Sequence, residues 1–137
     1  MTSRFPSATL GGQPDAIAPD GSEIRLLLAT EQTSVCHCTL PGGRTTLAVR
    51  HRTVEEIWFF LGGTGEVWRR DGSGEEVLGV GPGTSLAIPL GVEFQFRAIG
   101  DEALTFLIAT VPPWPGAEEA VRVADHWSPD VDLRAGY

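Results

Sequence analysis

The sequence predicts an all-β fold of the sandwich or barrel class, and three observations support this prediction. Segments in which apolar and polar residues alternate recur through residues 22–111. Glycine, proline and aspartate separate these segments at a spacing of about 8 to 12 residues, which is typical of sandwiches and barrels. No stretch in this range has the periodicity of an amphipathic helix. The 137 residues fit a single domain with one core.

The composition and the N-terminus exclude several classes of partner. The formal net charge is −8, and phosphate backbones bind basic surfaces, so we expect no nucleic-acid partner. No apolar run approaches the length of about 20 residues that crosses a bilayer, so we expect no membrane partner. The first residues, MTSRFPSATLGG, contain no apolar segment of signal-peptide length. We therefore expect a cytoplasmic protein.

The beginning of the chain predicts an arm followed by two strands. Residues 1–21 contain three prolines and three glycines, which indicates an irregular N-terminal arm with room for a short edge strand. Residues 22–29 and 33–40 are predicted strands. In the second strand, Cys36 and Cys38 point the same way about 7 Å apart, too far for a disulfide. We interpret them as buried small residues in a reducing compartment.

Residues 43–51 and 57–61 predict two strands joined by a short polar connection. The first alternates between two faces, and the second is rich in aromatic and β-branched residues. The connection holds Glu55 and Glu56, which should point in opposite directions. One face of the first strand is expected to carry Thr45, Leu47, Val49 and His51.

Five further strands complete the expected barrel, which spans residues 22–111. A strong hairpin sequence, DGSG, separates the first two of them. In the fourth, Phe94 and Phe96 share one face, and Gln95 and Arg97 share the other. The five predicted strands cover residues 66–70, 75–80, 84–88, 93–98 and 103–110.

Residues 112–137 are expected to form a C-terminal tail that packs on the barrel. Its prolines prevent a helix before Ala117, and residues 117–123 fit either a helical turn or a strand. Trp114 and Trp127 are large apolar groups in a region that is otherwise hard to pack. We expect them to pin the tail to the barrel. The alternative is that one of them covers the mouth of a pocket.

The spacing of glycine, proline, histidine and glutamate in this chain resembles that of the cupin superfamily. The residues that match its two motifs are Gly43, His51, Glu56 and Gly63 in the first, and Gly83, Pro89 and Gly91 in the second. The resemblance covers roughly residues 22–111. It implies a small single-domain cupin, with the double-stranded β-helix or jelly-roll barrel of that family. A typical cupin binds a metal through three histidines and one glutamate, but here Val49 and Phe94 occupy two of the histidine positions. The metal-ligand set is therefore degenerate.

His51 and Glu56 are the candidate catalytic residues. Strand alternation and the cupin register both aim them into the barrel, and a histidine beside a carboxylate can donate or accept a proton near neutral pH. The pair could instead be the remnant of a metal site or a structural polar pair. We expect no cofactor. The alternative is a divalent transition metal held by His51, Glu56 and His37, if the strand over residues 33–40 turns His37 inward.

Apolar residues at the former ligand positions predict an apolar cavity with one polar corner, which is typical of a small-molecule pocket. The alternative is a filled core. An arginine near the mouth could bind a substrate carboxylate through two hydrogen bonds. The candidate substrate-binding residues are Val49, Trp58, Phe60, Phe94, Phe96, Gln95 and Arg97.

The expected function is that of a small-molecule enzyme that catalyses a non-redox proton transfer: an isomerisation, cyclisation, elimination or dehydration. The resemblance to cyclase-like and isomerase cupins supports this by analogy of fold alone. One alternative is a metal-dependent cupin, such as a dioxygenase, with a reduced ligand set. Another is a cupin that binds a small ligand without catalysis. The expected partners are a small organic molecule and a second copy of the chain, since many cupins dimerise through sheet faces.

Overall fold

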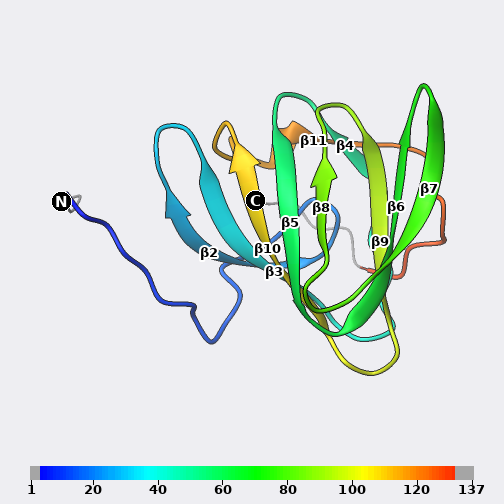
Figure 1. Ribbon diagram of the computed structural model, residues 1–137, viewed down its shortest axis with the longest axis horizontal. Coiled ribbons are helices and arrows are strands. Elements are labelled where there is room, and N and C mark those ends of the chain that lie inside the picture. The colour runs from blue at the N-terminus through cyan, green and yellow to red at the C-terminus, as the bar shows by residue number, and fades with distance from the viewer. Residues whose placement is uncertain (1–3, 132–137) are drawn as a thin grey trace.

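The computed structural model describes residues 4–131, which form two antiparallel β-sheets packed face to face (Figure 1). In spatial order, the larger sheet contains β1 (Ala16–Ile17), β2 (Glu23–Ala29), β3 (Ser34–Leu40), β10 (Leu104–Val111), β5 (Glu55–Gly62) and β8 (Ser85–Ile88). The smaller sheet contains β11 (Ala120–Arg122), β4 (Val49–His51), β9 (Glu93–Ile99), β6 (Thr64–Asp71) and β7 (Gly74–Val80). This architecture confirms the expected all-β jelly-roll barrel.

Alternation along the strands determines what lies between the sheets. In β5, Glu56, Trp58 and Phe60 are buried while the residues between them are exposed. Strand β9 of the opposite sheet directs Phe94 and Phe96 inward. Because each strand has one apolar face, burying both faces together excludes water from the interior.

An aromatic cluster forms the centre of the core. The ring of Trp58 lies 4.7 Å from that of Phe106 and 5.3 Å from that of Phe96, between ring centroids. Phe60 also packs on Phe106, at 4.6 Å. These separations are typical of packed aromatic pairs.

The connection from β5 to β6 depends on Gly63. Its φ angle is 74°, in the left-handed region that favours glycine. A Cβ at this position would lie 2.3 Å from the carbonyl oxygen of Ala103, just before β10. A side chain would therefore push the two sheets' connecting segments apart.

The strand expected over residues 43–51 is shorter than predicted. Only its last three residues form β4, and Thr45 makes an isolated bridge to Arg97. Between them the backbone pairs with distant segments: the N–H of Leu47 donates to the carbonyl of Asp20, and the N–H of Ala48 donates to the carboxylate of Asp125. The arm and the tail therefore complete hydrogen bonds that a neighbouring strand would otherwise make.

The tail contains both of the elements that residues 117–123 allowed. A 3-10 turn, η1 (Ala117–Glu119), leads directly into β11, which pairs with β4. Farther along, Trp127 lies beneath the guanidinium of Arg97, and His126 stacks on Trp68. The last part of the tail, residues 132–137, and residues 1–3 of the arm lie outside the described residues. Since η1 is the one helix in residues 4–131, no helix there is long enough to cross a membrane.

Candidate functional site

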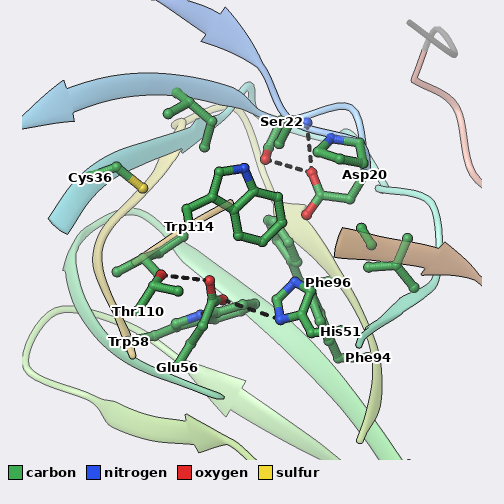
Figure 2. Close-up of a pocket in the computed structure, with 16 residues that line it drawn as sticks. Asp20, Ser22, Cys36, His51, Glu56, Trp58, Phe94, Phe96, Thr110 and Trp114 are labelled. Carbon is green, nitrogen blue, oxygen red and sulfur yellow. Dashed lines mark hydrogen bonds and ion pairs between the residues drawn. The ribbon is translucent and has the colours of Figure 1, made fainter. Parts of the chain in front are cut away.

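A cavity of about 40 Å³ lies inside the barrel, between the two sheets (Figure 2). A buried water needs about 10 to 15 Å³ of cavity volume, so this cavity has room for about three groups of the size of a water molecule. Strands of both sheets, the segment before β2 and the start of the tail contribute its walls. Its lining residues are Ala18, Pro19, Asp20, Ser22, Ile24, Cys36, Val49, His51, Glu56, Trp58, Phe94, Phe96, Ile108, Thr110, Trp114 and Ala120.

Glu56 is held by two hydrogen bonds that leave it facing the cavity. The indole N–H of Trp58 donates to Oε1 at 3.0 Å, and the hydroxyl of Thr110 donates to Oε2 at 2.8 Å. Trp58 lies two residues along β5, and Thr110 lies opposite Glu56 on the neighbouring strand β10. Both partners therefore follow from strand geometry, which places residues two apart, and residues opposite each other, on one face.

His51 faces Glu56 across a gap. Its Nδ1 lies 4.0 Å from Oε1 of Glu56, which is beyond hydrogen-bonding distance, and Nδ1 has no hydrogen-bond partner in the protein. The two residues are only 4% and 6% exposed. A buried polar atom without a partner is unusual, so the gap is a place where a ligand atom or water would bind.

The turn between the two residues is held by the tail. The carboxylate of Glu119 accepts hydrogen bonds from the N–H and hydroxyl of Thr53 and from the N–H of Val54. Burial alone would raise the pKa of Glu119, but these hydrogen bonds and His51 nearby lower it below its usual value. A charged residue of the tail thus fixes the connection between His51 and Glu56.

Burial shifts the pKa values of His51 and Glu56 in opposite directions. It raises the pKa of Glu56 to about 7, although the hydrogen bonds from Trp58 and Thr110 oppose the shift. It lowers the pKa of His51 to about 4, although the charge of Glu119 opposes that shift. In both cases the apolar interior disfavours the charged form. Near neutral pH the imidazole is therefore neutral, and the carboxyl group exchanges between its two protonation states.

Asp20 is a second carboxyl group at the cavity, and the sequence analysis did not identify it. One of its oxygens accepts two hydrogen bonds from Ser22, from the hydroxyl at 2.6 Å and the N–H at 2.9 Å. Burial raises its pKa, against the effect of these bonds. The sequence Pro-Asp-Gly-Ser is typical of a turn, and nothing local indicates that this turn returns to the barrel interior.

Trp114 is the contribution of the tail to the cavity. Figure 2 shows its ring above His51 and Glu56, with Asp20 to its right. The ring meets the imidazole of His51 edge-on, with centroids 5.2 Å apart. Its backbone N–H donates to the hydroxyl of Ser34, at the start of β3. Of the two tail tryptophans, Trp114 thus lines the cavity, and Trp127 lies on the outside of the barrel.

Four of the seven candidate substrate-binding residues line the cavity: Val49, Trp58, Phe94 and Phe96. Phe60 does not, because it lies two residues farther along β5 than Trp58 and is completely buried against Phe106. Its role is in the core.

The expectation that Gln95 and Arg97 bind a substrate in the cavity does not agree with their positions. They alternate with Phe94 and Phe96 on β9, so they lie on the outer face of the smaller sheet. Gln95 holds the tail through the backbone of His126 and Trp127, and Arg97 pairs with Glu66 at 2.6 Å. Both residues therefore stabilise contacts on the outside of the barrel and not the cavity in its interior.

The alternative metal site does not form either. Cys36, Cys38 and Leu40 are the residues of β3 that face the core, so His37 is on the opposite face, beside Arg25. Burial lowers the pKa of His37, and Arg25 adds to that shift. Across residues 4–131, no three histidine, cysteine, aspartate or glutamate side chains are placed to hold a metal ion. The donors present therefore do not fit the metal that a typical cupin uses.

Comparisons with known proteins agree with this fold. The family profile described as a cupin domain matches residues 36–110. Oxalate decarboxylase from Bacillus subtilis superimposes with a TM-score of 0.72 at 15% identity, over 90% of this chain and 34% of that chain. PAC13 from Streptomyces, solved with uridine, gives 0.69 at 9% identity, over 89% of this chain and 92% of that chain.

KdgF from Halomonas gives a TM-score of 0.61 at 15% identity, over 69% of this chain and 82% of that chain. Identities this low show a shared fold alone. The chain spans about a third of the length of oxalate decarboxylase. No curated protein matches the sequence.

Proposed function

The chain belongs to the cupin family, and we propose that within this family it is a small-molecule enzyme that catalyses a non-redox proton transfer. The observation that carries the proposal is the pair formed by His51 and Glu56. A neutral imidazole and a carboxyl group with a pKa of about 7 face each other across 4.0 Å in a buried cavity. A carboxyl group with a pKa near the operating pH is suited to act as both acid and base.

The gap between the two groups suits one substrate atom. An oxygen or nitrogen at about 2.8 Å from each would make a hydrogen bond to both. Neutral imidazole has one donor and one acceptor nitrogen, so Nδ1 can either accept from a substrate hydroxyl or donate to a carbonyl oxygen. His51 would thus orient the substrate and stabilise charge that develops on its oxygen.

Glu56 would move the proton. In its ionised form it removes a proton from a substrate carbon or oxygen. The carboxyl proton exchanges with solvent, and the protonated form then delivers a proton to a neighbouring atom of the substrate. No electrons leave the substrate, and no water is required. The bonds from Trp58 and Thr110 hold the carboxyl group in one orientation through both steps. Positioned proton transfer of this kind typically accelerates a reaction by about 10² to 10⁴.

Apolar residues at two of the positions where a typical cupin has metal ligands support a reaction that needs no metal. Val49 and Phe94, which stand at histidine positions of the first and second cupin motifs, are cross-strand partners and offer no ligand atoms. His51 and Glu56 alone are too few for a stable site. We therefore propose that the protein works without a metal cofactor.

Exchange of substrate hydrogens with solvent would test this function. Small hydroxy- and oxo-compounds are incubated with the protein in D₂O, and deuterium incorporation is followed by NMR. We expect Glu56→Gln and His51→Ala to reduce exchange by about 10² to 10⁴. The matched control is Glu55→Gln, the same change at the exposed neighbouring residue, which should exchange like the wild type. A chelator should have no effect.

Three results would contradict the proposal. Exchange that survives both substitutions would place the chemistry elsewhere. Exchange that a chelator abolishes would indicate the metal-dependent alternative. Ligand binding without exchange of any compound in the panel would indicate a non-catalytic binding protein.

A further inference from the structure

We propose that the cavity accepts a small organic cation, with a protonated amine as the group that it encloses. This inference rests on the proposed function, because it names the class of substrate for the same site. It follows from three features of the cavity: its two carboxyl groups, the unpartnered Nδ1 of His51 and its aromatic walls.

Two carboxyl groups flank the cavity, and each carries a negative charge when it is ionised. Glu56 lies on β5 of the larger sheet, and Asp20 lies on the segment that precedes β2. Figure 2 shows the two carboxyl groups on opposite sides of the Trp114 ring. The lining residues include no lysine or arginine. Arg97, the expected partner of a substrate carboxylate, lies on the outside of the barrel with Glu66.

The cavity also contains a buried polar atom that needs a partner. His51 is 96% buried, given its exposure of 4%, and its Nδ1 makes no hydrogen bond with the protein. As an acceptor, this nitrogen would take one N–H of an ammonium group whose other N–H groups bind the oxygens of Glu56. An ammonium group has three donors, so it can satisfy a set of acceptors that a hydroxyl cannot.

Aromatic side chains form much of the remaining wall. Trp58, Phe94, Phe96 and Trp114 all line the cavity, and no lysine or arginine among the lining residues competes with a cationic ligand for these rings. Aromatic rings attract cations through their negative faces, and the attraction strengthens when water is excluded. A wall of this kind favours an alkylammonium group over a neutral alcohol of the same size.

The same cavity disfavours an anionic ligand. Its charge would enter a dry interior beside two carboxyl groups, with no cation to compensate. The volume of about 40 Å³ further limits the enclosed part to about three non-hydrogen atoms. Ethylammonium has this size.

The experiment compares three probes that each have three non-hydrogen atoms but differ in charge: ethylammonium, ethanol and formate. Each is titrated into the full-length protein at constant sodium chloride, and the indole N–H signal of Trp58 is followed by NMR, since that group donates to Glu56. A ligand of three atoms binds at best in the millimolar range. We expect saturable binding of ethylammonium in that range, at least tenfold weaker binding of ethanol, and no shift with formate.

Two variants and one control locate the effect. Asp20→Asn and Glu56→Gln should each weaken ethylammonium binding at least fivefold while leaving ethanol unchanged. Glu55→Gln, on the exposed side of β5, should bind like the wild type. Should Asp20→Asn fail to fold, the order of the three probes with the wild type and Glu56→Gln decides the question.

Formate binding as tightly as ethylammonium, or a cation preference that persists in both variants, would overturn the proposal. These failures are distinct from failure of the proposed function. If Glu56-dependent exchange occurs with neutral or anionic substrates only, the proton-transfer function holds and the cation inference is wrong. If ethylammonium binds as expected and no compound exchanges, the inference about the ligand holds and the catalytic function is wrong.

Discussion

At the scale of single residues, the chemistry of this cavity depends on what surrounds His51 and Glu56. In a typical cupin these positions would face further histidines around a metal. Here Val49 and Phe94 replace two of those ligands, and burial becomes the largest influence on the pKa values of the two remaining groups. Two apolar side chains thus stand where a typical cupin has metal ligands, and they leave His51 and Glu56 facing each other in a largely apolar cavity.

The opposite pKa shifts predict a measurable dependence of stability on pH. The pKa of Glu56 is raised from 4.5 to about 7, so the folded state retains a proton that the unfolded state has lost, and stability falls as pH rises through this window. The pKa of His51 is lowered from 6.5 to about 4, so its contribution to stability rises with pH between those values. In the wild type the two effects largely cancel.

The substitution Glu56→Gln removes the contribution of Glu56 to this pH dependence and leaves that of His51. Relative to the wild type, the variant should become more stable as pH rises from 4.5 to 7, by roughly 3 kcal/mol in the free energy of unfolding. Urea unfolding between pH 4 and pH 8 measures this difference, and Glu55→Gln provides the control on the exposed side of the strand. A constant difference between Glu56→Gln and the wild type at every pH would show that burial does not shift the pKa of Glu56.

At the scale of elements, the barrel depends on two segments that are not part of its central strands. The arm supplies Asp20 and accepts a backbone hydrogen bond from Leu47. The tail supplies Trp114 to the cavity and Glu119 to the turn beside His51. The site is therefore complete only when the segment around Asp20 and the tail around Trp114 and Glu119 have docked on the barrel.

Gln95 is the residue whose substitution tests this docking. Its buried amide accepts from the N–H groups of His126 and Trp127 and donates to the carbonyls of Trp127 and Thr46. Gln95→Met keeps the volume but leaves these groups without partners, which should cost about 3 kcal/mol of stability. Hydrogen exchange should accelerate in residues 124–130 more than in β5 or β10.

A control for this prediction is Arg70→Gln, which removes the exposed ion pair with Glu93 on the same sheet and should change stability by less than about 1 kcal/mol. Unchanged exchange in the tail of Gln95→Met would show that other contacts are enough to hold it.

At the scale of the whole molecule, the outer face of the larger sheet carries an apolar strip. Its members lie on the adjacent strands β5 and β10 and are unusually exposed for large apolar residues: Ile57 at 60%, Phe59 at 45%, Leu61 at 44% and Val111 at 47%. Because β5 and β10 are inner strands, this strip lies on the face of the sheet and not at its edge. We expect a second copy of the chain to cover it, since an exposed apolar strip is typical of an interface and can pair with itself around a two-fold axis.

Sedimentation equilibrium tests this dimer. The wild type should sediment as a dimer at micromolar concentration, and Phe59→Lys should sediment as a monomer with an unchanged fold. Leu90→Lys, at a residue that is 56% exposed but lies outside the strip, should remain dimeric. A monomeric wild type, or a dimer unaffected by Phe59→Lys, would contradict the prediction.

The sequence by itself determined the strands, their turns and the inward direction of His51 and Glu56. These features follow from local rules: side chains alternate along a strand, and glycine, proline and aspartate end it. Nearly every predicted strand agrees with the structure within two residues. The strand over residues 43–51 is the exception, because its missing partners are the arm and the tail.

Only the tertiary structure decided which face of β3 points inward, and therefore that His37 is not at the cavity. Alternation shows that neighbouring side chains of a strand point to opposite faces of the sheet. It does not show which face lies inside the barrel when both faces are covered. It likewise could not show that Gln95 is buried beneath the tail, or that Asp20 and Trp114 meet at the cavity. Contacts between segments far apart in the chain leave no local pattern, since they arise from how the two ends fold back onto the barrel.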